Sequence, residues 1–238
     1  MKILAFDSTA KAASAAVCED GKLLALYNID NGLTQSELLL PMIENLLASL
    51  KMDYSDISVF ATSTGPGSFT GVRIGVALLK GLAFGRNAAC VGVSTLEALA
   101  ENAKGLKGLI VPVMDARRNE FYNAIFRCDG NKTERLTPDR AISADELAKE
   151  LTEYGEDIYL TGDGYDIAVK LLSERGVILR NTPSLLRSEN AYSIATLALS
   201  KYKNGEIMSD SEIMPTYLRL PQAERERLER LKEKGDEK

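Results

Sequence analysis

The sequence predicts an α/β protein built from two similar halves, each with strands and helices in layers. The chain opens with a strand at residues 2–7 and a hairpin whose turn carries Asp20-Gly21, the strongest short hairpin signal. Helical and β-prone segments then alternate, a pattern typical of layered α/β folds. An Asp-bearing strand followed by a hairpin occurs again near residue 109. The length of 238 residues fits one large domain or two small ones.

The elements of the first half follow from local patterns. Short apolar, β-prone runs predict strands, and longer runs with helical periodicity predict helices. Ser94 is a good N-cap and Glu97 completes a capping box, so a helix is expected to begin there. The expected strands are residues 2–7, 13–18, 23–27, 57–62 and 89–93, and the expected helices are about 36–50, 69–86 and 95–103.

The segment Gly105–Gly108 marks the expected boundary between the halves. Beyond it, the expected strands are residues 109–114, 120–128 and 157–161, and the expected helices are 143–154, 167–174 and 191–202. We therefore expect a first subdomain over residues 1–105 and a second over 106–210, with helix 191–203 packing back on the first. Residues 211–238 form an extended segment and a tail of alternating charges, expected to be a solvated helix or a frayed end.

Composition excludes several classes of protein. No apolar run approaches the ~18–20 residues that span a bilayer, and residues 1–7 resemble a strand, so a cytoplasmic protein is expected. Three widely spaced cysteines without a CxxC pair support neither a zinc site nor a disulfide framework. The net charge of −5 gives no general attraction for phosphate backbones, so contact with nucleic acid would need a basic partner.

The longest motif is a glycine-rich turn, Gly65–Gly75, in a chain without histidine. Its GxGxxxG spacing is not the dinucleotide fingerprint, and no Lys-Ser/Thr pair follows as in a P-loop. A tight strand-to-helix turn and an anion site at a helix N-terminus both remain open. The absence of histidine removes the commonest general base and metal ligand, so neither a catalytic residue nor a metal ligand is assigned.

Two other polar segments are candidates for binding. Asp7-Ser8-Thr9 ends the first strand, where a nucleotide-binding fold can hold magnesium or phosphate, although a simple capping turn is the alternative. Asp115–Glu120 is a charged turn that could bind an anion or a partner, or simply be solvated. The candidate nucleotide or phosphate contacts are Asp7, Ser8, Thr9, Gly65 and Gly67.

The helices before and after the glycine turn are too apolar for one buried face. The apolar residues of 36–50 spread over about half of the helical wheel, wider than the ~100° stripe that a core requires. Between Val72 and Phe84, the only charges are Arg73 and Lys80. Either the chain buries both helices, or they form a protein–protein interface, which we favour. The predicted interface residues are Leu38, Leu39, Met42, Ile43, Leu46, Gly71, Val72, Gly75, Val76 and Leu79.

Six segments, in order along nearly the whole chain, resemble the bacterial TsaB family, also called YeaZ. They are ILAFDSTAKAASAAV, SELLLPMIENLL, GPGSFTGVRIGVALLKGLA, VGVSTLEALA, VMDARRNEFYNAIF and PTYLRLPQAERE. The pair GPGSFTGVRIG and DARRxExY is highly specific. The resemblance implies the ASKHA fold, with two ribonuclease-H-like subdomains as in actin, Hsp70 and sugar kinases.

The resemblance also implies a function in making N6-threonylcarbamoyladenosine at position 37 of tRNAs that read ANN codons. The catalytic relative TsaD carries a HxxxH metal motif, which this chain cannot contain. A non-catalytic partner of TsaD is therefore expected, working with the ATPase TsaE, touching tRNA through the complex and forming a homodimer without TsaD. No cofactor is firmly expected, and any weak ATP or ADP binding belongs to the complex interface. Gln35 replaces a histidine that is common in relatives.

An autonomous ASKHA enzyme, either a small-molecule kinase or a peptidase, is the alternative. The sequence lacks a Ser/His/Asp set and HExxH, which weighs against a peptidase, and its phosphate loops are incomplete for a kinase. Whether the purified chain alone hydrolyses ATP or peptides distinguishes these alternatives from a partner protein.

Overall fold

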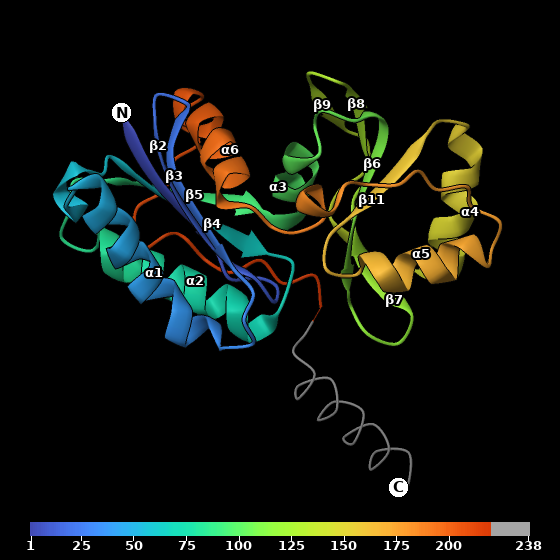
Figure 1. Cartoon of the computed structure of the whole chain (residues 1–238), viewed down its shortest axis with the longest axis horizontal. Helices are drawn as coiled ribbons and strands as arrows, with labels where there is room; N and C mark the ends of the chain where they lie inside the picture. Colours follow the sequence, from blue (N-terminus) through green and yellow to red (C-terminus); the bar gives the residue numbers. More distant parts are fainter. Residues whose placement is uncertain (220–238) are drawn as a thin grey trace, which may run out of the picture.

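The computed structural model describes residues 1–219, and the predicted charged tail lies almost wholly outside them. Two subdomains lie side by side, each built on its own sheet (Figure 1). The α/β prediction is confirmed. Within residues 1–219, no helix is long and apolar enough to cross a membrane.

The first sheet has the strand order β3-β2-β1-β4-β5. The opening hairpin makes its first three strands antiparallel, whereas β4 and β5 run parallel to β1. The strand bounds are Lys2–Asp7 for β1, Ala13–Glu19 for β2, Lys22–Ile29 for β3, Val59–Gly65 for β4 and Ala89–Ser94 for β5.

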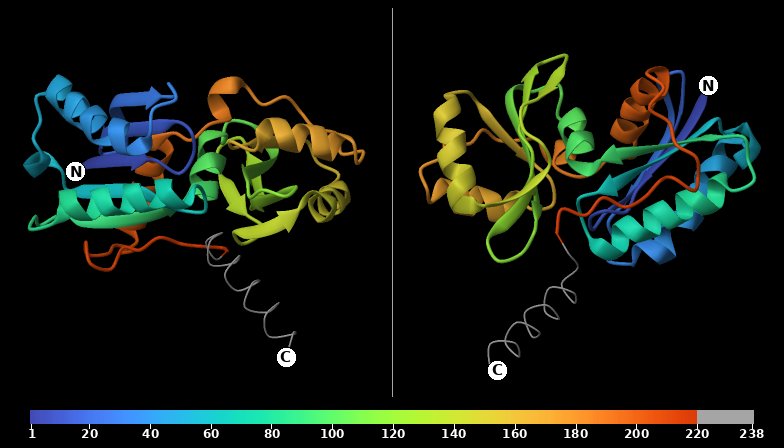
Figure 2. Two further views of the ribbon diagram at one scale, coloured as in Figure 1. Left: turned by 90° about the horizontal axis from the view of Figure 1, so that it is seen from below. Right: turned by 180° about the vertical axis from the view of Figure 1, so that it is seen from behind.

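Helices cover both faces of this sheet (Figures 1 and 2). Successive residues of a strand point to opposite faces. Accordingly, Leu4 and Phe6 of β1 pack under α1 and α2, whereas Ile3 and Ala5 pack under α6. β1 is therefore a central strand, buried on both sides. The helix bounds are Gln35–Leu50 for α1, Phe69–Ala83 for α2, Thr95–Asn102 for α3 and Ala191–Lys203 for α6.

The second sheet repeats the arrangement around β6. β7 and β8 pair antiparallel with β6, and β11 pairs parallel with it, as β2 and β4 do with β1. α4 and α5 cover one face, and α3 covers the other. The bounds are Lys107–Asp115 for β6, Glu120–Asn123 for β7, Phe126–Asp129 for β8, Thr133–Arg135 for β9, Arg140–Ser143 for β10, Ala144–Tyr154 for α4, Ile158–Thr161 for β11 and Tyr165–Ser173 for α5.

The single strand expected over residues 120–128 is divided into β7 and β8. The division lies opposite Pro112 of β6, which has no N–H to donate to a neighbouring strand. At this point a side chain takes part in the pairing, because Asn123 Nδ2 donates a hydrogen bond to the Pro112 carbonyl at 2.9 Å. Ile125 turns toward another segment, since its N–H donates to Thr137 Oγ1 and its carbonyl accepts from the Leu136 N–H. With this division, the second half repeats the strand–hairpin–helix unit of the first, as the sequence predicts.

Within residues 1–219, three stretches of chain cross between the subdomains (Figure 1). The first is the connection from α3 to β6, and the second is the segment 186–190, which leads into α6. The third, residues 208–219, we call the C-terminal strap. Buried cysteines occur in both subdomains, with Cys18 and Cys90 in the first sheet and Cys128 in the second, and all three are free thiols.

Candidate functional site

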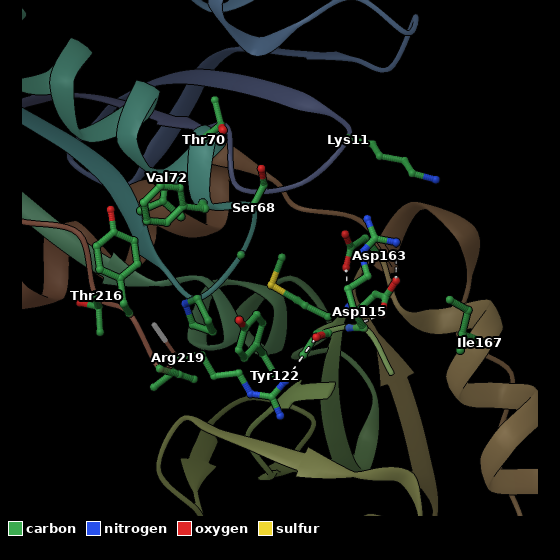
Figure 3. A pocket seen from close by; sticks show the side chains of 18 residues that line it. Lys11, Ser68, Thr70, Val72, Asp115, Tyr122, Asp163, Ile167, Thr216 and Arg219 are labelled. Carbon is green, nitrogen blue, oxygen red and sulfur yellow. Dashed lines mark hydrogen bonds and ion pairs between the residues drawn. The ribbon is translucent and has the colours of Figure 1, made fainter. Parts of the chain in front are cut away.

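A cleft of about 520 Å³ lies between the two subdomains (Figure 3). The first subdomain contributes Lys11 and residues 67–70, which lead into α2. The second contributes Asp115, Arg117 and Tyr122 from the β6–β7 hairpin, and Asp163 from the segment after β11. The C-terminal strap, residues 216–219, lines the remaining side. The cleft therefore joins residues from five stretches that are distant in the sequence.

The glycine-rich turn packs directly against Asp7-Ser8-Thr9. A Cβ atom on Gly71 would lie 1.9 Å from the Ser8 carbonyl oxygen, and one on Gly67 would lie 2.7 Å from that of Thr9. The Ser68 N–H donates to the Thr9 carbonyl at 2.7 Å, and Ser8 Oγ donates to the Gly71 carbonyl at 2.8 Å. The glycines are required here because the two backbones touch.

This contact buries most of the residues predicted to hold phosphate. Asp7, Ser8 and Thr9 are at most 1 % exposed, and Gly65 is also buried. Asp7 Oδ1 accepts hydrogen bonds from the Thr9 N–H and hydroxyl, both at 2.8 Å. The predicted contacts lie together, but of these five only Gly67 lines the cleft. The other four lie behind the contact between the two turns, and direct phosphate contact by them stays a prediction.

Two carboxyl groups that carry no sequence motif, Asp163 of the cleft and the buried Glu189, lie near Asp7. Glu189 is 3 % exposed, and its Oε1 has no hydrogen-bond partner among residues 1–219. Burial raises the pKa of Glu189 well above its usual value, and the charges of Asp7 and Asp163 raise it further. Burial also raises the pKa of Asp7, and exclusion of water by the surrounding protein raises that of Asp163. No motif marks Glu189, which is brought to Asp7 only by the fold.

A smaller pocket of about 190 Å³ adjoins these carboxyl groups. It carries both signs of charge, from Asp30, Asp163, Asp166, Glu189, Lys11 and Arg187. Within residues 1–219, no group of three or more His, Cys, Asp or Glu side chains has the geometry of a metal site.

The charged turn Asp115–Glu120 forms one lip of the cleft. Arg117, Arg118 and Asn119 all have left-handed backbone conformations, with φ of 69°, 57° and 60°. The Arg117 N–H donates to Asp115 Oδ1 at 2.8 Å, and its guanidinium pairs with Oδ2 at 3.2 Å. Three consecutive non-glycine residues in this region store backbone strain. The two contacts with Asp115 therefore hold the turn in one strained backbone conformation.

Gln35 has a local function in this fold. Its Nε2 donates to the carbonyl oxygens of Ala10 and Lys11, at 2.8 Å in each case. One amide nitrogen thereby joins the start of α1 to the loop that carries Lys11 into the cleft. A single histidine ring nitrogen supplies only one such donor.

The helix residues predicted to form a partner interface are mostly internal. Leu38 is half-buried, but the other nine are buried, and the side chains among them pack in the core between the helices and the sheet. This part of the prediction is wrong, because the inner half of each helix faces the sheet. The nine are Leu39, Met42, Ile43, Leu46, Gly71, Val72, Gly75, Val76 and Leu79.

Comparison with known proteins agrees with the fold and the motifs. The family model described as "TsaD: tRNA N6-adenosine threonylcarbamoyltransferase" matches residues 34–227. The TsaB protein of Escherichia coli K12, named as a tRNA threonylcarbamoyladenosine biosynthesis protein, is 31% identical over 92% of this chain and 95% of its own. The Bacillus subtilis protein of the same name is 29% identical over 94% and 96%.

A solved structure shows the same arrangement. YeaZ from Pseudomonas aeruginosa has a TM-score of 0.77 at 27% identity, covering 91% of this chain and 99% of its own. A second Pseudomonas aeruginosa structure, described as similar to peptidase YeaZ, has a TM-score of 0.78 at the same identity, over 92% of this chain and 99% of its own. Together with the sequence matches along the full length, this places the chain in the TsaB family, among the proteins that the TsaD family model matches.

Proposed function

We propose that this chain is a non-catalytic partner of TsaD in forming N6-threonylcarbamoyladenosine at position 37 of tRNAs that read ANN codons, in the cytoplasm and together with TsaE. The observation that carries the proposal is membership of the TsaB family in a chain of 238 residues without a histidine. A histidine metal motif of the kind expected in TsaD cannot form here. Transfer of the threonylcarbamoyl group is therefore assigned to the partner.

The cleft supports weak nucleotide binding at most by the isolated chain. The N–H of Ser68 is already bonded within the protein, and Asp7 is buried behind the turn. Among residues 1–219, a phosphate group in the cleft would meet the turn before α2 and the side chains of Lys11 and Arg117, while the third lining cation, Arg219, is already paired with Glu120. We propose that any ATP or ADP is held mainly where the chain meets its partner. Calorimetry giving a sub-micromolar dissociation constant for the isolated chain would contradict this.

The outer faces of α1 and α2 are the proposed surface for TsaD and, without TsaD, for a second copy of this chain. Ile74, Ala77, Leu78 and Gly81 follow helical spacing along the outer side of α2, and each is exposed or half-buried. Leu38 and Pro41 extend the surface onto α1, which lies beside α2 (Figure 1). An apolar stripe on the solvent side of a helix is typical of a helix-packed interface.

A reconstitution tests whether TsaD, and not this chain, transfers the threonylcarbamoyl group. Purified chain, TsaD and TsaE are mixed with tRNA and threonylcarbamoyl-adenylate, each protein is omitted in turn, and digested tRNA is analysed by mass spectrometry for the modified nucleoside. We expect product only when TsaD is present, and more product when this chain is added. Robust product from this chain without TsaD would show an autonomous enzyme and refute the proposal.

The partner surface is tested by Ala77→Glu, which places a charge at the centre of the outer stripe. Desolvating that unpaired charge costs several kcal/mol, so binding to TsaD should weaken by at least about a hundredfold. Thr152→Glu adds the same charge to an exposed position of α4 and should leave binding unchanged. Both variants must first match the wild-type circular dichroism spectrum. Wild-type affinity of a folded Ala77→Glu variant would exclude this surface.

A further inference from the structure

The C-terminal strap, residues 208–219, is firmly seated on the first subdomain. Met208 exchanges two backbone hydrogen bonds with Cys90 of β5, at 2.9 and 3.0 Å. The Ile213 side chain is fully buried in the core under α1 and α2. Further on, the Thr216 N–H donates to the Thr64 carbonyl at 2.7 Å. The strap therefore behaves as an added edge element of the first sheet.

A glycine makes room for the strap at the end of β4. A Cβ atom on Gly65 would lie 2.5 Å from the Thr216 carbonyl oxygen, and the φ of Gly65 is +118°. Both features restrict the position to glycine. The first glycine of the glycine-rich turn thus serves the strap, a role that its motif does not suggest.

Aromatic and cationic side chains fix the strap beside the cleft. The ring of Tyr217 lies 5.0 Å from that of Phe69, centroid to centroid. Arg73 Nε donates to the Tyr217 hydroxyl at 2.9 Å, and the Arg73 guanidinium lies 4.0 Å above the Phe69 ring. Tyr217 is therefore anchored to the first turns of α2, and the next two residues reach toward the second subdomain.

Arg219 makes the contact across the cleft (Figure 3). Its guanidinium lies 2.5 Å from Glu120 Oε2 and donates to the Ala116 carbonyl at 3.3 Å. Ala116 and Glu120 close the strained turn of the β6–β7 hairpin, joined by a 3.0 Å backbone hydrogen bond. The side chains of Arg219 and Glu120 are 17% and 35% exposed, so solvent screens this ion pair less than a pair of fully exposed side chains.

The position of the strap sets it apart from the other two crossings. The first crossing begins at α3 and the second ends at α6, and these two helices contact each other. α6 packs on the face of the first sheet opposite to α1 and α2. The strap follows the opposite side, along α2, and ends beside the second subdomain (Figures 1 and 2). Separating the subdomains around α3 and α6 would pull Arg219 away from Glu120.

We propose that the C-terminal strap is an interdomain latch, in which the Arg219–Glu120 ion pair holds the cleft closed. Opening of the latch would allow the walls of the 520 Å³ cleft to separate and a ligand or partner segment to enter. This inference is independent of the proposed function, since it concerns only the contact between the two subdomains.

Spin-label distances in the full chain test the latch. Lys22→Cys and Glu153→Cys place labels at exposed positions of β3 and α4, and the three native cysteines are buried. Dilution with unlabelled chain removes distances between copies. Pulsed electron resonance should give a narrow distribution in this background. Glu120→Gln and Arg219→Gln should each broaden it and shift it to longer distances.

Two controls separate the latch from a general loss of charge. Asp157→Asn removes an exposed ion pair with Arg180 inside the second subdomain, 2.8 Å long, and should leave the distances unchanged. The exchange Glu120→Arg with Arg219→Glu should restore the narrow distribution. Unchanged distances in Glu120→Gln, whose conservative change preserves the hairpin, would overturn the latch. So would failure of the folded exchange variant to restore the closed distribution.

Discussion

At the scale of single residues, the buried carboxyl groups of Asp7 and Glu189 link stability to pH. Folding raises the pKa of both groups, chiefly through burial. Above the unfolded values of 3.8 and 4.5, the unfolded chain releases protons that the folded chain still holds. The free energy of unfolding therefore falls as the pH rises, until the folded groups also ionise.

We expect Glu189→Gln to flatten this dependence. The amide cannot ionise, so the variant should lose a slope of up to about 1.4 kcal/mol per pH unit and gain on the wild type toward about pH 8. Near about pH 4 the two proteins should differ least, because the wild-type carboxyl is protonated in both states. Urea unfolding across this range measures the effect. Asp166→Asn, at an exposed position, is the control, and parallel curves for wild type and Glu189→Gln would contradict the expectation.

At the scale of elements, α1 and α2 show what periodicity can and cannot reveal. Their existence and nearly all of their bounds agree with the expectation, and their wide apolar surface is real. A helical wheel cannot tell which half of that surface meets the chain's own sheet, because this depends on where the strands lie. Leu39 and Val76 therefore looked suitable for a partner although they fill the core.

The features of the site that the sequence did not predict also depend on contacts between distant segments. Asp7 and the glycine-rich turn were recognised from local motifs, but their mutual contact, which hides Asp7, depends on backbone packing. Glu189 and Arg219 carry no local signal, since each acts on a residue far away in the sequence. Pro112 would have indicated the division between β7 and β8 only if the sequence had shown which segment pairs with it.

Two glycines of α2 should respond in opposite ways to alanine. In Gly71→Ala, the new methyl group collides with the Ser8 carbonyl, so a loss of stability of at least about 1–3 kcal/mol is expected. In Gly81→Ala, nothing lies within 4 Å of the new atom, and the helix should gain about 0.5–1 kcal/mol. Guanidinium unfolding of both variants provides the comparison. Equal effects would mean that the contact between the two turns is not rigid.

At the scale of the whole molecule, α3 packs against both subdomains. Leu96 and Leu99 of α3 share an apolar cluster with Ile110, Met114 and Phe126 of the second subdomain. α3 also contacts α6 and β4 of the first. The repeated halves could be expected from the sequence. The sharing of α3 could not, because nothing in the sequence of an apolar helix face says which strands or helices it will pack against.

Truncation of Leu99 should therefore loosen both halves. We expect Leu99→Ala to cost about 2–5 kcal/mol, and hydrogen exchange to accelerate in β4 and β11 together. Leu147→Ala removes an equally buried side chain that packs only within the second subdomain. Its effect should be concentrated in β11, α4 and α5. If Leu99→Ala accelerated exchange in one sheet alone, the subdomains would unfold independently.

The buried thiols give each half of the molecule its own chemical reporter. Burial raises the pKa of Cys18 and of Cys90 to about 11, so both remain protonated and unreactive while the first sheet is intact. Cys128 is shielded in the second sheet, where its Sγ lies 2.8 Å from the Lys104 carbonyl oxygen. An alkylating reagent can modify each thiol only after its own strand has opened. Mass mapping of the modified cysteines over time would thus give the opening rate of each sheet separately in the unaltered chain.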